Sequence, residues 1–293
     1  MNAASIKNLI GTLLATAAGL GIAFAGGQGS AQVLGLPLFL VAIVAVFLIQ
    51  WIAFIIAFIQ KSERFFDLTG SLTYISVTTL SVFLISEIDN RSVLLLVLVV
   101  IWATRLGTFL FTRIQSAGRD DRFNEIKVNF SRFLLTWTIQ GLWVTFTAAA
   151  ALGAITSTNQ KPLGWIALVG FVVWAVGFFF ELLADVQKSA FKANPENKGK
   201  FIQTGLWAWS RHPNYFGEIV IWIGVAIIAL PVLRGWALLT LISPLWVILQ
   251  LTVISGVPML EKKADKRWGD QEDYQRYKAN TPILIPRPPS KGK

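Results

Sequence analysis

The residues best suited to chemistry lie in one short stretch, Ser210–Glu218, which contains His212, the only histidine in 293 residues. The chain has no cysteine, which excludes a thiolate nucleophile, a Cys/His zinc site, a c-type haem attachment and a disulfide. Pro213 favours a helix that starts at His212 or just after it. The amides at a helix N-terminus carry partial positive charge, so together with Arg211 and His212 they predict a phosphate site.

Further polar side chains follow along this predicted helix. Arg211, Tyr215 and Glu218 have the spacing of residues that share one helix face, and Asn214 lies at its flank. This face would present a guanidinium, a phenol, a carboxylate and an amide. The alternative is a belt of aromatic and basic residues that holds the helix among lipid headgroups. Glu218 argues against the belt, because an anchor does not need a carboxylate one turn deeper.

A second polar stripe precedes this stretch. Four charged residues, spaced by four, three and four positions, share one helix face: Glu181, Asp185, Lys188 and Lys192. They could form a solvated, self-pairing face, but an ionisable group near hydrocarbon is costly, which favours a functional role for Glu181. The following loop, 194–207, is rich in amides, lysines and glycines, which suits an anionic ligand.

The charged segment Glu261–Tyr277 is typical of an amphipathic surface helix. Its Trp268, Tyr274 and Tyr277 could equally close over a ligand bound to the basic loop. The tail that follows, 285–290, is rich in proline and is predicted to be a disordered end.

The elements that must position these residues are membrane helices. Hydrophobic residues make up 54% of the chain and charged residues 14%, against roughly a quarter charged in soluble domains. A helix needs about 20 apolar residues to cross a bilayer. Eight apolar runs are predicted to be spans: 6–25, 37–59, 71–86, 92–112, 132–154, 163–184, 216–231 and 236–256. The short runs 71–86 and 216–231 could be tilted or re-entrant, so we expect an all-α bundle of seven to eight transmembrane helices.

The lysines and arginines predict the orientation of these spans. Arg91, Lys161 and Arg234 lie in loops on one side, whereas Arg105 falls inside a span and the remaining basic residues lie on the other side. Because positive charge collects in cytoplasmic loops, both termini are expected in the cytoplasm, and in a bacterium the membrane would be the inner one. The net charge of +10 then reflects topology and attraction to anionic lipid rather than nucleic acid binding. We expect the first span to be retained rather than cleaved as a signal peptide.

Several polar residues lie within the predicted spans. Gln50 and Gln140 are explained about equally well by interhelical hydrogen bonds and by a role in a site. Arg105 could pair with a carboxylate or extend its charge to the cytoplasmic surface. Tyr74, one turn after Ser71, is the best candidate for a buried phenolic donor.

The pattern of these residues resembles the steroid 5-alpha-reductase family, in its bacterial-type branch. The resemblance covers most of the chain. It is carried by Ala184–Lys188, Phe191–Pro195, Asn197–Ile202, Gly205–Trp207, Ser210–Glu218, Asp265, Arg267–Gly269, Tyr274 and Thr281–Pro282, and it extends to Asp67–Tyr74 and Trp102–Leu106.

The resemblance implies a multi-pass helical reductase that uses NADPH to reduce a carbon–carbon double bond conjugated to a ketone, typically in a 3-oxo-delta-4 steroid. Such a reaction needs an acid that polarises the ketone oxygen, but neither a metal nor a flavin. We therefore expect one membrane domain over 1–293, with substrate-side helices in 1–160 and the cofactor-binding part in 161–293. The implied partners are a steroid or another hydrophobic enone and membrane lipid.

The resemblance also implies roles for individual residues. Asn214, Tyr215 and Glu218 would approach the nicotinamide, with Glu218 among the catalytic residues. The phosphates and adenosine would be bound by Asp185, Lys188, Lys192, Asn194, Lys198, Lys200, Arg211 and His212, and the site would be closed by Asp265, Tyr274 and Tyr277.

One departure from the family pattern affects the ketone-binding residues. In the mammalian-type branch a glutamate and a tyrosine on early helices hold the ketone, but here Gln50 is followed by Trp51, and the candidate aligned before Arg105 is Trp102. We therefore expect Tyr74 and Gln50 to polarise the ketone.

Two other functions remain open. The Arg-His-Pro-x-Tyr motif at 211–215 and the acidic C-terminal stretch also resemble integral membrane methyltransferases that use S-adenosylmethionine, such as isoprenylcysteine carboxyl methyltransferase and phospholipid N-methyltransferases. The basic segment 188–200 favours a pyrophosphate-bearing cofactor instead. A non-enzymatic lipid-binding protein is the third possibility, and Glu181 and Glu218 argue against it because simple lipid binding does not need buried carboxylates.

Overall fold

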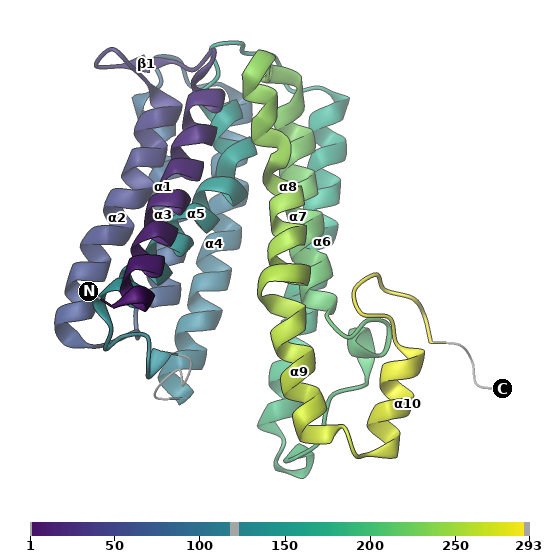
Figure 1. Ribbon diagram of the computed structural model, residues 1–293. Helices are drawn as coiled ribbons and strands as arrows, with labels where there is room; N and C mark the ends of the chain where they lie inside the picture. Colours follow the sequence, from purple (N-terminus) through teal and green to yellow (C-terminus); the bar gives the residue numbers. More distant parts are fainter. Residues whose placement is uncertain (1, 118–122, 290–293) are drawn as a thin grey trace. The chain divides into compact units, whose positions relative to one another are not determined.

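The computed structural model describes residues 2–117 and 123–289, and these residues are mainly helical (Figure 1). A short antiparallel hairpin with two residues in each strand, β1 (Gln32–Val33) and β2 (Leu36–Pro37), joins the first two helices. The α-helices are α1 (Ala3–Gly27), α2 (Leu38–Gln60), α3 (Phe66–Leu84), α4 (Asn90–Ala117), α5 (Phe130–Ile155), α6 (Trp165–Ala193), α7 (Pro213–Ala229), α8 (Ser243–Leu249), α9 (Gly256–Trp268) and α10 (Glu272–Asn280).

Seven helical segments of the described chain are long and apolar enough to cross a membrane, the last being the segment Gly235–Trp268. This confirms the predicted multi-pass helical membrane protein. The predicted span 71–86 falls in α3, which is not among the seven and contains polar residues such as Asp67 and Thr73. The helix α6, which contains most of the predicted span 163–184, continues to Ala193, which agrees with the single helix face predicted for Glu181, Asp185, Lys188 and Lys192. It stops before Asn194-Pro195, since the residue before a proline disfavours helical geometry.

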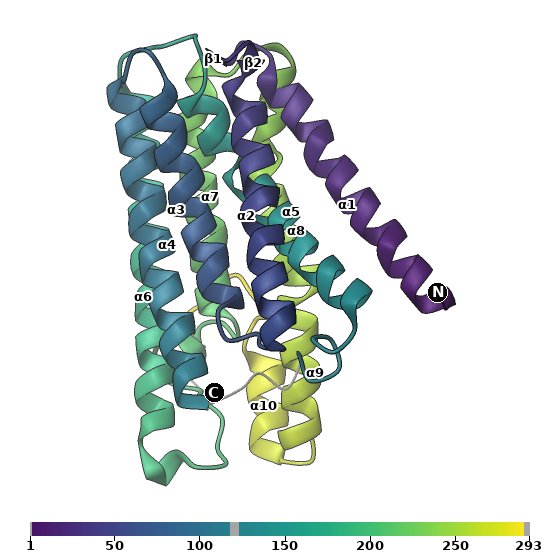
Figure 2. The same cartoon turned by 90° about the vertical axis from the view of Figure 1, so that its left-hand side faces the viewer.

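The chain divides into two compact units, and the first consists of residues 1–167 together with 226–243. Within it, α5 packs against α1, α2, α3 and α4. The C-terminal half of α5 is buried on all sides, and Gly153 lies so close to the 3-10 helix Gly235–Ile242 that a Cβ atom there would be 2.9 Å from Thr240 Oγ1. The N-terminal end of α1 diverges from α2 (Figure 2).

The second unit consists of residues 168–225 and 244–293. Its helices α6 and α7 approach each other backbone to backbone through glycines. A Cβ atom on Gly177 would lie 2.6 Å from Ile221 N, and one on Gly217 would lie 2.6 Å from Glu181 N. Small residues allow such close approach between membrane helices. The glycines therefore fix Glu181 on α6 beside the first turns of α7.

The prediction that 285–290 is a disordered end is contradicted at Arg287, whose N donates a hydrogen bond to Trp209 O at 2.9 Å. Just before this stretch, Ser210 Oγ donates to Leu284 O at 2.9 Å and Arg211 N donates to Pro282 O at 2.9 Å. Residues 282–287 therefore lie along the 209–211 loop. These bonds are largely to backbone groups, so the proline-rich composition gave no sign of them.

Candidate functional site

The structure places the polar stripe of α6 along a gradient of burial. Glu181 and Asp185 are buried, Lys188 is partly exposed and Lys192 is exposed. The Lys188 ammonium lies 4.2 Å from the centre of the Trp207 ring, and a cation over a tryptophan face is attracted by the ring electrons. The stripe thus runs from the buried part of the second unit to its charged surface.

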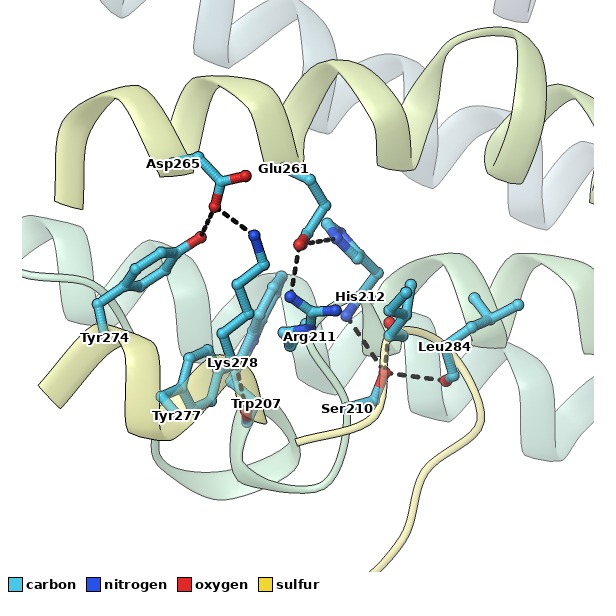
Figure 3. Close-up of polar contacts among 11 residues, drawn as sticks. Trp207, Ser210, Arg211, His212, Glu261, Asp265, Tyr274, Tyr277, Lys278 and Leu284 are labelled. Atoms are coloured by element: carbon cyan, nitrogen blue, oxygen red, sulfur yellow. Dashed lines mark hydrogen bonds and ion pairs between the residues drawn. The ribbon is translucent and has the colours of Figure 1, made fainter. Parts of the chain in front are cut away.

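The start of α7 holds the densest set of polar contacts. The helix begins at Pro213, as predicted, and both Arg211 and His212 are buried. Glu261 extends from α9 and accepts hydrogen bonds from Arg211 Nη1 and, at 2.8 Å, from His212 Nε2 (Figure 3). The His212 ring stacks on Tyr215, with ring centres 5.6 Å apart and planes 10° apart.

These contacts define which groups remain for a ligand. Burial lowers the pKa of His212, and hydrogen bonding to Glu261 opposes this only in part. A neutral His212 that donates from Nε2 has an unprotonated Nδ1, which can only accept. Within the described part of the chain, neither His212 Nδ1 nor Arg211 Nε has a hydrogen-bond partner, and both atoms are buried. The site therefore offers one buried acceptor and one buried donor.

The C-terminal helices hold the basic loop in place. Asp265 accepts hydrogen bonds from Tyr274 Oη at 3.1 Å and from Lys278 Nζ (Figure 3). Tyr277 Oη donates to Trp207 O at 2.7 Å, and Trp268 Nε1 donates to Gly199 O at 2.6 Å.

Both tyrosines are neutral donors at physiological pH. Burial and the neighbouring Asp265 raise the pKa of Tyr274 to about 12, and burial also raises the pKa of Tyr277. The phenol protons of Tyr274 and Tyr277 are thus used to bind this chain's own groups.

The basic loop borders a cavity of about 440 Å³. Lys198, Lys200, Gln203, Thr204 and Asp273 are among the residues that line it. The lysines and amides are suited to a phosphate.

Asn194 and Asn214 were also predicted to bind the cofactor, and they lie in different surroundings. Asn194 Oδ1 accepts a hydrogen bond from Glu196 N at 3.0 Å and so caps the 3-10 helix Pro195–Asn197. Asn214, on the first turn of α7, is partly exposed.

The predicted ketone-binding residues lie in the first unit. Tyr74 is buried and packs edge-on against Trp102, with ring centres 5.1 Å apart. Gln50 is fully buried, and its Nε2 donates to Thr73 Oγ1 at 2.9 Å. Its Oε1 has no partner among the described residues, so Gln50 presents an acceptor and would have to polarise a ketone with its second N–H. Gln140 donates from Nε2 to Phe66 O at 3.1 Å.

Glu261 was not predicted as a site residue, although it links the two residues at the start of α7. One signal for such a role was present in the sequence: Glu261 and Asp265 are four positions apart and so share one helix face. Asp265 was a predicted site residue, and in the structure it contacts Tyr274 and Lys278.

Comparison with known proteins identifies the family to which the chain is related. Residues 53–281 match the family described as "Protein of unknown function (DUF1295)". No solved structure matches.

Three of the curated proteins that match the chain each cover a smaller part of it than the family does. A 157-residue region is 25% identical to 3-oxo-5-alpha-steroid 4-dehydrogenase 1 of Rattus norvegicus, covering 52% of this chain and 55% of the relative. A 69-residue region is 32% identical to steroid 5-alpha-reductase DET2 of Gossypium hirsutum, covering 24% and 27%. Another 69-residue match is 41% identical to "Probable O-methyltransferase ustE" of Ustilaginoidea virens, covering 24% and 23%.

The chain thus spans about half the length, or less, of these curated relatives. The family match covers most of the chain, and two of the three relatives are steroid 5-alpha-reductases by name. The protein therefore belongs to the DUF1295 family and is similar in sequence to the steroid 5-alpha-reductases.

Proposed function

We propose that the protein is a membrane-embedded, NADPH-dependent reductase of a carbon–carbon double bond conjugated to a ketone. Its substrate class would be a 3-oxo-delta-4 steroid or a similar cyclic enone lipid. The cofactor site would face the cytoplasm, on the side to which the basic loops are assigned. The resemblance to steroid 5-alpha-reductases supports the reaction class, and the polar groups of the second unit support the cofactor.

One observation carries the cofactor assignment. His212 Nδ1 and Arg211 Nε are buried without partners among the described residues, and leaving such groups unpaired costs about 1–3 kcal/mol each. A neutral Nδ1 cannot bind phosphate, which has only acceptors at the site, but it can accept from a ribose hydroxyl. His212 is thus assigned to a ribose, whereas Lys188, Lys192, Lys198 and Lys200 supply positive charge for the phosphates.

The chemistry divides between the cofactor and the chain. Bound NADPH would supply the reducing equivalent for the carbon–carbon double bond. The chain must stabilise negative charge that develops on the ketone oxygen, which requires a positioned donor. Tyr74 is the proposed donor because it is a buried phenol held against Trp102, and Gln50 would assist through its second N–H. Glu218, buried on α7, is proposed to act near the nicotinamide together with Asn214 and Tyr215.

Tyr74→Phe tests the donor. The variant keeps the ring on Trp102 but removes the hydroxyl, so turnover of a steroid enone should fall by about 100-fold, a typical loss for one acid or one donor to developing negative charge. NADPH affinity should not change. Unchanged turnover would remove Tyr74 from the mechanism and leave the cofactor assignment standing.

A methyltransferase is the second candidate function, because the match to the probable O-methyltransferase is 41% identical over its 69 residues. S-adenosylmethionine also carries ribose hydroxyls that His212 could bind. It has no phosphate, however, and would leave the lysine-lined cavity at 198–204 without a role. The cavity therefore favours a phosphorylated dinucleotide.

Calorimetric titration of the detergent-purified protein separates the two functions. We expect NADPH to bind, and Arg211→Ala and His212→Ala to weaken it by about tenfold each, since each removes one or two hydrogen bonds. Lys7→Ala is a matched control, because Lys7 lies near the start of α1 in the first unit. Tight binding of S-adenosylmethionine without binding of NADPH would overturn the reductase proposal.

A further inference from the structure

The helical segment Gly235–Trp268 is interrupted near its middle. After α8, the residues Gln250–Ile254 form a π-helix, and α9 starts anew at Gly256 after an irregular Ser255. A Cβ atom on Gly256 would lie 2.6 Å from Leu251 O and 2.8 Å from Tyr215 Cε2. The interruption therefore lies directly against the ring that stacks on His212. π-Helices are rare, and they are frequent at functional sites.

Gln250, the first residue of the π-helix, has a buried side chain that lacks a partner. It is 3% exposed, and its Oε1 accepts no hydrogen bond from any described residue. Polar neighbours on the same segment are satisfied: Thr252 Oγ1 donates to Ile248 O at 2.7 Å, and Ser255 Oγ donates to the Gln250 main-chain oxygen at 3.1 Å. Inside a membrane helix no water is available to donate a hydrogen bond to an unpaired carbonyl oxygen. A bound ligand could supply the missing donor to Gln250 Oε1.

The hydrogen-bonding chemistry of Gln250 Oε1 restricts which functional groups of a ligand could bind it. Because the oxygen is an acceptor, the ligand must bring an N–H or O–H group. A ketone and a phosphate bring neither, which excludes the substrate ketone and the pyrophosphate. A primary carboxamide matches both ends of a glutamine side chain, since it donates to Oε1 and accepts from Nε2.

The position of Gln250 along the chain further restricts which part of a ligand could bind there. Glu261, which binds Arg211 and His212, lies 11 positions later on the same helical segment. Gln250 is flanked by apolar residues such as Leu249 and Leu251. The charged end suits the phosphates and riboses, whereas the apolar stretch suits an uncharged ring.

We propose that Gln250 recognises the carboxamide of the reduced nicotinamide ring, with Oε1 accepting from the ligand N–H and Nε2 donating to the ligand carbonyl. This inference rests on the proposed NADPH-dependent function. It assigns a role in nucleotide binding to the π-helix, which begins at Gln250.

The test compares two ligands, of which only the first carries the nicotinamide: NADPH and 2′-phospho-ADP-ribose. In Gln250→Leu, affinity for NADPH should fall by about tenfold, whereas affinity for 2′-phospho-ADP-ribose should not change. Thr252→Val, on the same turn, should alter neither affinity. An equal loss for both ligands, or no loss for NADPH, would overturn the inference. If the wild-type protein bound neither ligand, the proposed function itself would fail, which is a distinguishable result.

Two further measurements do not depend on activity. Without ligand, Gln250→Leu should melt at or above the temperature of the wild type, because leucine removes an orphaned polar group at similar volume; a lower melting temperature would indicate a structural role and contradict the inference. The wild type should also bind the reduced 3-acetylpyridine analogue of NADPH about tenfold more weakly than NADPH, because an acetyl group has no N–H. Equal affinity for the two would overturn the proposal without any variant.

Discussion

Replacing Glu261 by glutamine should destabilise the second unit. The Glu261 carboxylate accepts hydrogen bonds from both Arg211 and His212, and the three side chains are 18%, 9% and 6% exposed. Breaking a fully buried pair costs about 3–5 kcal/mol, because the remaining charge has no partner. Glutamine keeps one acceptor oxygen, and the site is partly open to water, so we expect a loss of about 2 kcal/mol in the free energy of unfolding. For a chain of this size that is roughly 4–8 °C in melting temperature.

The assay is thermal unfolding of the ligand-free protein in detergent at neutral pH. Glu272→Gln is the matched control, because Glu272 is an exposed acid in the first turn of α10; it should cost less than about 1 kcal/mol. A melting temperature for Glu261→Gln within 1 °C or so of the control would refute the reasoning, since the buried Arg211 charge would then not depend on Glu261.

Two other predictions concern the same unit. Because burial lowers the pKa of His212, the native state holds the imidazole neutral while the unfolded chain takes up a proton near pH 6.5, so stability should fall as pH drops from about 6.5 toward the native pKa. His212→Gln should flatten that part of a melting-temperature profile against pH, and an unchanged slope would show that another group is responsible. Gly217→Ala should lower stability by about 1–3 kcal/mol through overpacking, because its Cβ would lie 2.6 Å from Glu181 N. Gly21→Ala, with nothing within 4 Å of the added Cβ, should not destabilise; similar melting temperatures for the two variants would contradict the close packing of α6 on α7.

The sequence predicted the elements better than the contacts between them. Length and hydropathy suffice to locate helices in a membrane, since a spanning segment must satisfy its own backbone groups. The start of α7 was also predictable, because proline at the first helical position costs no hydrogen bond. These signals are local, and each is carried by residues that are neighbours in sequence.

The central contact of the candidate site was not predictable in this way. His212 and Glu261 are 49 positions apart, and the four-residue spacing of Glu261 and Asp265 is a weak signal, because acids on a solvated surface helix share it. The contact of residues 282–287 with the 209–211 loop uses main-chain acceptors, and a main-chain carbonyl is present whatever the side chain. The π-helix at Gln250 is likewise invisible to a periodicity of 3.6 residues, because the segment is apolar on both sides of the interruption.

The most direct test of the proposed reductase is a turnover measurement on the detergent-purified wild-type protein. NADPH consumption is followed after addition of a 3-oxo-delta-4 steroid, with the corresponding saturated 3-oxo steroid as control, and the product is analysed by mass spectrometry. The proposal predicts NADPH consumption with the enone alone and a product heavier by two hydrogens. No consumption across a panel of cyclic enone lipids, with a methylated product when S-adenosylmethionine is supplied instead, would contradict it.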